Sequence, residues 1–266
     1  MIDYVHGYTE REAQRLIDQA DTLAALLHHG TTYTAGSRVL EAGCGTGAQS
    51  VHLVANSPDA VFTAVDRSGE SLAAARLAAA RSGKGRVSFH QADITALPMA
   101  DDTFDDAFVC FLLEHLPAPE RALAEIARVV VPGGTVTVIE GDHGTYFCHP
   151  RSPAADRVVD CLVTLQAQKG GDALIGRRLY PLLASAGCRE IRVSPRMVYV
   201  DASRPQLVDG FTKNTFIAMV AGVREEALAQ GLVTPAAWQA GMDALNRATA
   251  PDGVFGYTFF KATAIV

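Results

Sequence analysis

Three glycines stand at alternate positions directly after a short apolar run: Gly43, Gly45 and Gly47. This pattern is typical of a buried strand that turns abruptly into a helix. Glycine adopts backbone angles that other residues avoid, and it has no Cβ atom to keep a ligand away from the backbone. A nucleotide site at the carboxyl end of a strand requires both properties. The spacing therefore predicts a ligand-binding turn.

An acidic residue ends the next apolar segment. Residues 60–65 form a short apolar run, and Asp66 follows it, about 20 residues beyond the glycine turn, where a ribose diol is bound in nucleotide-binding sheets. A carboxylate at this point accepts hydrogen bonds from both hydroxyls of the ribose. The two features together predict a nucleoside site. The alternative is a tight strand–helix turn without a ligand.

Two carboxylates and an imidazole crowd the end of a predicted strand at 135–140: Glu140, Asp142 and His143. Histidine titrates near neutral pH, so it can take a proton from a weakly acidic substrate. We expect His143 to bind or deprotonate the substrate, with Glu140 or Asp142 as the second choice. The alternative is a polar loop whose side chains cap one another.

From Glu41 to Gly47 the sequence resembles the first motif of the class I S-adenosylmethionine-dependent methyltransferases, an acidic residue followed by G-x-G-x-G. A dinucleotide enzyme carries G-x-G-x-x-G instead, with a pyrophosphate over the helix N-terminus. Glu41 would repel a pyrophosphate but suits a cationic sulfonium. A nicotinamide-dependent reductase typically also has a Tyr-x-x-x-Lys pair, and neither feature stands at the proper place.

The resemblance implies further cofactor contacts. In this family an Asp after the third strand accepts from the adenine amino group while the next residue packs on the ring, and Asp93 and Ile94 match those positions. An acceptor beside an apolar surface suits the edge and face of a purine. A simple polar turn is the alternative. Arg67, next to the predicted ribose contact, is also expected at the cofactor.

Two more contacts rest on the same resemblance. Residues 112–117 resemble the family's segment after strand four, which places His115 near the cofactor, and Phe111 ends that strand. A structural histidine is the alternative for His115. The family lays an amino-terminal segment over the cofactor, which implies a contact from Tyr8. An aromatic staple beside a packed helix is the alternative for Tyr8.

Strands and helices alternate at short spacing, which predicts a parallel sheet covered by helices on both faces. Together with the resemblance, this favours an α/β fold: a doubly wound, Rossmann-like, mostly parallel sheet of seven strands with an antiparallel last strand and a helical cap. We expect residues 1–35 to form an amino-terminal helical cap segment and 36–200 the cofactor-binding core, with an added helix within 151–170. Residues 201–252 are expected to form a helical lid and 253–266 a strand that completes the sheet.

The charge and cysteine content of the chain indicate which classes of binding partner to expect. The 266 residues carry a formal net charge of −6, which argues against nucleic acid because phosphate contacts need clustered Lys and Arg. Five scattered cysteines without a C-x-x-C pair suit reduced thiols and argue against a structural metal. No segment resembles a signal peptide or a membrane helix. We therefore expect a cytoplasmic monomer or homodimer.

The function implied by the resemblance is methyl transfer from S-adenosyl-L-methionine, by in-line displacement, to a small-molecule acceptor such as a metabolite or natural product. The product of the cofactor is S-adenosyl-L-homocysteine. Two alternatives stay open. The chain could be a non-catalytic, cofactor-binding regulatory or accessory subunit, or a methyltransferase that acts on a protein or peptide.

Overall fold

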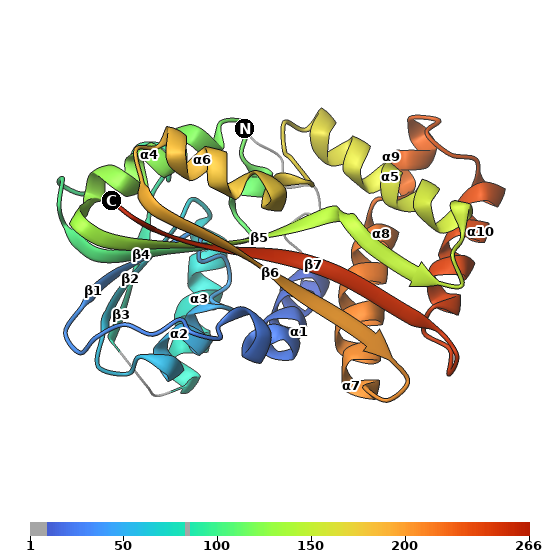
Figure 1. Ribbon diagram of the computed structural model, residues 1–266, viewed down its shortest axis with the longest axis horizontal. Coiled ribbons are helices and arrows are strands. Elements are labelled where there is room, and N and C mark those ends of the chain that lie inside the picture. The colour runs from blue at the N-terminus through green and yellow to red at the C-terminus, as the bar shows by residue number, and fades with distance from the viewer. Residues whose placement is uncertain (1–9, 83–85) are drawn as a thin grey trace.

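The computed structural model describes residues 10–82 and 86–266, so Tyr8, a predicted cofactor contact, lies outside the described residues. One seven-stranded sheet runs through this part of the chain in the order β3-β2-β1-β4-β5-β7-β6 (Figure 1). Its strands are β1 Arg38–Ala42, β2 Val61–Asp66, β3 Arg86–Gln91, β4 Phe104–Cys110, β5 Val130–His149, β6 Arg189–Asp201 and β7 Val254–Ile265.

The last strand of the chain lies inside the sheet. β7 pairs antiparallel with β5 on one side and with β6 on the other, while β1 to β5 pair in parallel. Because both of its faces are covered, β7 is buried along most of its length rather than at alternate residues only. The arrangement confirms the predicted fold class.

Helices cover both faces of the parallel half (Figure 1). α1 Glu10–Leu27, α2 Ser50–Asn56 and α3 Gly69–Ser82 lie on one face, and α4 Pro119–Val129 and α6 Leu179–Ser185 lie on the other. Short 3₁₀ turns, η1 Leu113–His115 and η2 Ile175–Arg178, precede α4 and α6. In the described part of the chain no helix is long and apolar enough to cross a membrane.

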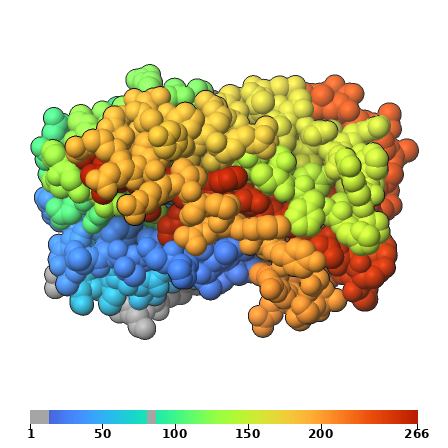
Figure 2. Space-filling view, in the orientation of Figure 1, coloured from blue at the N-terminus to red at the C-terminus, as the bar shows by residue number. Residues whose placement is uncertain are grey.

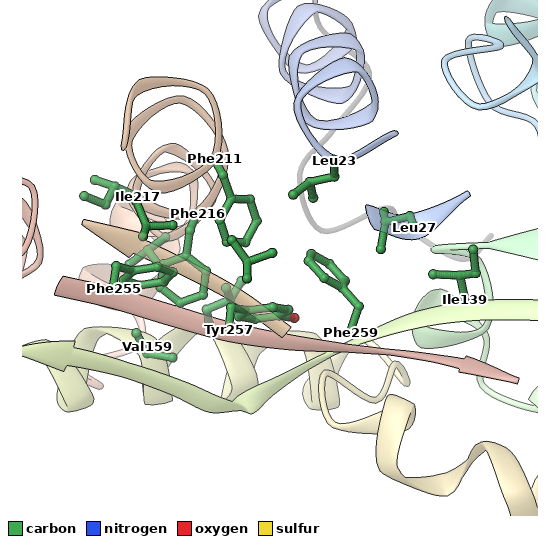
Figure 3. Packing of buried hydrophobic residues seen from close by; sticks show 14 of the residues in the cluster. Leu23, Leu27, Ile139, Val159, Phe211, Phe216, Ile217, Phe255, Tyr257 and Phe259 are labelled. Carbon is green, nitrogen blue, oxygen red and sulfur yellow. The ribbon is translucent and has the colours of Figure 1, made fainter. Parts of the chain in front are cut away.

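β5, β6 and β7 extend beyond the parallel half and carry a second group of helices (Figure 1). This group consists of α5 Pro153–Gln168, α7 Pro205–Leu207, η3 Val208–Ile217, α8 Ala218–Gly222, α9 Arg224–Ala229 and α10 Pro235–Arg247. Aromatic side chains join η3 to β7: the ring centroid of Phe216 lies 4.8 Å from that of Phe255 and 5.7 Å from that of Tyr257 (Figure 3). Such pairs contribute about 1 kcal/mol each beyond their buried area.

The predicted end of the fifth strand was wrong. Residues 140–146 do not form a loop after a strand at 135–140, because β5 begins at Val130 and continues to His149. β7 is long enough to pair with both ends of this extension, which satisfies backbone polar groups of β5 there. The pairing is irregular between Asp142 and Phe147, and this irregularity lies next to His143.

Within the segment 201–252, expected to be helical, residues 205–229 form four short consecutive elements. These are α7, the π-helix η3, α8 and α9. η3 passes so close to α1 that a Cβ on Gly210 would lie 2.4 Å from the hydroxyl oxygen of Thr22. η3 and α1 are therefore in tight contact. The space-filling view shows this group packed against the rest of the molecule (Figure 2).

Candidate functional site

A cavity of about 520 Å³ opens at the carboxyl ends of β1 to β4. Its walls come from the turns that follow these four strands, from α3 and from Leu16 and Gln19 of α1. Parallel strands bring their carboxyl ends to one edge of the sheet, where ligands of such folds bind. Residues far apart in sequence, such as Gly45, Asp66 and Asp93, therefore line one space.

The three glycines of the turn after β1 have different roles. All have positive φ: +73° at Gly43, +52° at Gly45 and +82° at Gly47. A Cβ at Gly43 would lie 2.7 Å from Leu112, and one at Gly47 would lie 3.1 Å from Ala75, so these two glycines allow close packing. A Cβ at Gly45 would meet no atom within 4 Å. Gly43 and Gly45 line the cavity, and Gly47 packs against α3.

Asp66 ties the glycine turn to the end of β2. Its Oδ2 accepts a hydrogen bond from the Gly45 N–H at 2.9 Å, and its Oδ1 accepts one from the Ser68 N–H at 2.8 Å. Asp66 and the exposed Arg67 both line the cavity. The carboxylate thus lies where the sequence predicts it, and it also shapes the turn.

Glu41 lies behind the turn rather than in the described cavity wall. Only 2% of it is exposed, and its Oε2 accepts a hydrogen bond from the Ser50 hydroxyl at 2.6 Å. Burial raises the pKa of this carboxyl to about 7. Because Ser50 begins α2, this bond joins the end of β1 to the helix that follows the glycines.

Asp93 and Ile94 follow β3 and both line the cavity. Asp93 Oδ1 accepts from the N–H and from the hydroxyl of Thr95, at 2.8 and 2.7 Å, and the backbone bond is the main reason that the pKa of Asp93 is lowered. Ile94 is buried. A charged carboxylate therefore stands beside an apolar surface, as the resemblance implies.

Phe111 and His115 lie where a second, smaller cavity of about 50 Å³ adjoins the first. The two cavities share Leu16, Gln19, Phe111 and His115 as wall residues. Phe111 has a φ of +54°, and its ring centroid lies 5.4 Å from that of Phe259. The segment after β4 thus separates two compartments.

The second cavity has aromatic walls with a few polar groups. Phe211, Phe216, Tyr257 and Phe259 supply rings from η3 and β7, and Figure 3 shows them converging between those elements. Arg15, Glu114 and His143 also line it. Its walls have the apolar character of ligand sites, but its volume of about 50 Å³ suits one functional group of a ligand and not a whole molecule.

His143 is the one residue of the predicted catalytic trio that lines a described cavity. Its Nδ1 lies 2.7 Å from the Tyr257 phenol oxygen, and its Nε2 has no partner among the described residues. Burial lowers its pKa below the usual 6.5. The imidazole is therefore neutral near pH 7.

Glu140 and Asp142 are engaged in the fold. Glu140 Oε1 accepts from the N–H groups of Leu112 and Leu113, at 3.0 and 2.7 Å. The guanidinium of Arg177 donates to both oxygens of Asp142: Nε donates to Oδ2, and Nη2 donates to Oδ1 at 2.8 Å. These two carboxylates position the segment after β4 and the turn η2 before α6, and they line neither cavity.

The bonds of Glu140 lead to a test of its role in holding the segment after β4. Burial raises the pKa of Glu140 well above its usual range, so a neutral amide of the same shape should serve as well. We expect Glu140→Gln to change the free energy of unfolding by less than about 1 kcal/mol, and Glu140→Leu to lower it by about 2–4 kcal/mol because two buried N–H groups lose their acceptor. Urea denaturation measures both. A Leu variant as stable as wild type would contradict this role.

Sequence reasoning missed Arg15, Gln19 and Tyr257. Arg15 and Gln19 are buried four residues apart on α1 and hydrogen-bond each other at 3.1 Å, a polar pair on an otherwise apolar face. Two polar residues four positions apart on an apolar helix face could have indicated from the sequence that this face borders a polar site. Tyr257 and Lys261 have the Tyr-x-x-x-Lys spacing, but they lie in β7 and Lys261 Nζ donates to the His29 carbonyl at 2.9 Å.

Known methyltransferases are similar in sequence to the part of the chain that forms most of the larger cavity. A family described as "Methyltransferase domain" matches residues 40–138. Demethylmenaquinone methyltransferase of Clavibacter sepedonicus is 39% identical over 126 residues, which cover 47% of each chain. An uncharacterized 37.1 kDa protein in transposon TN4556 of Streptomyces fradiae is 32% identical over 189 residues, covering 70% of this chain and 54% of that protein.

Among solved structures, the YcgJ protein of Bacillus subtilis has a TM-score of 0.58 at 17% identity, covering 92% of this chain and 97% of its own. That likeness shows the fold. The chain spans about half the length of most of the curated relatives it matches, for example 47% of the Clavibacter enzyme and 56% of another relative. The family match itself covers the glycine turn and the ends of β2, β3 and β4.

Proposed function

We propose that this chain, which belongs to the class I S-adenosylmethionine-dependent methyltransferases, transfers a methyl group to a small organic molecule. S-Adenosylmethionine would occupy the larger cavity, and the reacting group of the acceptor would occupy the smaller one. The observation that carries this proposal is the adjoining pair of cavities. One has carboxylates at strand ends, and the other has aromatic walls.

The residues of the larger cavity fit this cofactor. The open space at Gly45 lets a ligand approach the backbone, Asp66 has the chemistry to bind ribose hydroxyls, and Asp93 with Ile94 suits an adenine. Arg67 lies beside the proposed ribose contact. When bound, S-adenosylmethionine supplies an electrophilic methyl group, whose bond to sulfur breaks as the acceptor's lone pair forms the new bond. The product is S-adenosylhomocysteine.

The chain's own contribution is to orient the acceptor and exclude water. Phe111 and His115 form part of the wall between the cavities, and rings of η3 and β7 close the far side. Holding two reactants in line removes much of the entropic part of the barrier. Of the three residues proposed as catalytic, His143 lines the smaller cavity, where it would contact the acceptor. Glu140 and Asp142 hold the surrounding backbone.

Asp66→Asn tests the ribose assignment. The amide keeps one acceptor oxygen for the turn but loses a charged acceptor, so we expect binding of S-adenosylhomocysteine to weaken about tenfold, or about 1.4 kcal/mol. Calorimetric titration measures the affinity, and Asp59→Asn, an exposed aspartate before β2, is the control. Equal affinities in the two variants would remove Asp66 from the cofactor site.

The proposed activity is tested by incubating the protein with methyl-tritiated S-adenosylmethionine and a library of small organic acceptors. Radioactivity in an organic product supports the proposal and identifies the acceptor. Tight cofactor binding without transfer to any acceptor would favour a regulatory or accessory subunit, and transfer to peptides alone would favour a protein methyltransferase. In-line displacement, a cytoplasmic location and a monomeric or homodimeric state remain predictions.

A further inference from the structure

The contact between Tyr257 and His143 decides what the second cavity offers a ligand. Tyr257 lies on β7, and its hydroxyl reaches across to the irregular part of β5, where it meets His143 Nδ1 at 2.7 Å. A Cβ on Gly141 would come within 2.4 Å of that hydroxyl. Glycine at 141 therefore lets the phenol oxygen lie directly against the β5 backbone.

The hydrogen-bond partners of Tyr257 fix the direction of this bond. Burial raises the pKa of the phenol well above its usual 10, so Tyr257 keeps its proton at neutral pH. Among the described residues His143 Nδ1 is the partner for the phenol's own proton. A buried O–H group without an acceptor is costly, so Tyr257 donates and Nδ1 accepts.

The imidazole is neutral, so it carries a single proton. Burial is the largest cause of its lowered pKa; Glu114 and Asp142 oppose the shift, and His115 and Arg15 add to it. With Nδ1 acting as an acceptor, the proton must sit on Nε2. Nε2 is buried and has no partner among the described residues, on a side chain that lines the second cavity.

We propose that Tyr257 holds His143 in the Nε2–H tautomer, so that the second cavity offers a ligand a neutral hydrogen-bond donor and not a general base. The ligand class that fits this donor carries a carbonyl or an ionised hydroxyl oxygen. Tyr257 is then a positioning residue, because it acts on the ligand through His143. The part concerning the methyl acceptor rests on the proposed function, whereas the tautomer does not.

Nitrogen-15 NMR of the protein labelled on its histidine rings tests the tautomer directly. Proton–nitrogen correlations identify which ring nitrogen carries the proton, and loss of one of the eight histidine signals in His143→Gln assigns His143. We expect Nε2 to be protonated and Nδ1 bare at pH 7 and above, where the lowered pKa of His143 keeps the ring neutral. A proton on Nδ1 in the wild-type protein would overturn the proposal, whether or not any methyl transfer has been found.

Tyr257→Phe removes the donor to Nδ1. We expect the His143 signals of this variant to show Nδ1–H, alone or in exchange with Nε2–H. Unchanged Nε2–H signals would show that something other than Tyr257 sets the tautomer and would overturn the positioning role. If the variant does not fold, the wild-type spectrum still decides which nitrogen is protonated.

Kinetics with an acceptor found in the transfer screen tests the role of the donor. Glutamine at 143 can donate a hydrogen bond but cannot serve as a base, whereas alanine can do neither. We expect His143→Gln to retain kcat within about tenfold of wild type and His143→Ala to lose about 100-fold, as for removal of a single hydrogen-bond donor from an active site. Equal, large losses in both variants would overturn the donor role. If no acceptor is methylated, the proposed function fails while the NMR result still stands.

Discussion

Gly45→Leu is expected to weaken binding of S-adenosylmethionine and S-adenosylhomocysteine by at least about 100-fold, or about 2.7 kcal/mol. Gly45 lines the larger cavity, and a Cβ there would extend into space that no protein atom within 4 Å occupies. A leucine side chain would fill the space that the proposed cofactor needs. Calorimetric titration with S-adenosylhomocysteine measures the loss.

The substitution also places a side chain on a residue with a φ of +52°, which costs about 1–2 kcal/mol of stability. Gly231→Leu is a matched control, because Gly231 has a φ of +67°, a Cβ there would also meet nothing within 4 Å, and it lines neither cavity. We expect both variants to lose similar stability but only Gly45→Leu to lose affinity. Equal affinities would mean that the glycine turn does not border the ligand.

Glu41→Gln is expected to remove a pH-dependent part of the stability. Burial raises the pKa of Glu41 from 4.5 to about 7 in the folded protein. Between those values the folded state holds a proton that the unfolded state has lost, so the free energy of unfolding falls as pH rises. The fall from this group is about 3 kcal/mol, and it is complete above the folded pKa.

Urea denaturation of wild type and Glu41→Gln at several pH values between 4 and 8 measures this effect. We expect the free energy of unfolding of the variant, relative to wild type, to rise by about 3 kcal/mol across that range. Glu120→Gln, at an exposed glutamate in α4, is the control. Parallel curves for wild type and Glu41→Gln would show that Glu41 is not a buried carboxyl in the folded protein.

The parallel half of the fold could be predicted because its signals are local. Apolar runs that end at Ala42, Asp66 and Cys110 each precede a turn and a helix, so their residues alone define strand–helix units. The position of β7 came from the resemblance. The length of β5 could not be predicted because its extension depends on pairing with β7, more than a hundred residues later in the chain. In addition, glycines at 141 and 144 are locally typical of a loop.

The two cavities also differ in how far their wall residues could be predicted from the sequence. The wall of the larger one was largely predictable, since Gly43, Gly45, Asp66, Asp93 and Ile94 stand at strand ends and all line it. The smaller one draws its residues from α1, η3 and β7, which no motif connects. Its central contact, between His143 and Tyr257, joins residues 114 positions apart. Only the folded sheet shows that Tyr257 faces His143.

The most direct test of the account is calorimetric titration of the purified protein with S-adenosylhomocysteine, S-adenosylmethionine and NADH. The account predicts that the first two bind with one site per chain and micromolar affinity, that Gly45→Leu abolishes this binding, and that NADH does not bind. Binding of NADH with no binding of the other two would contradict it, and so would the absence of binding by all three.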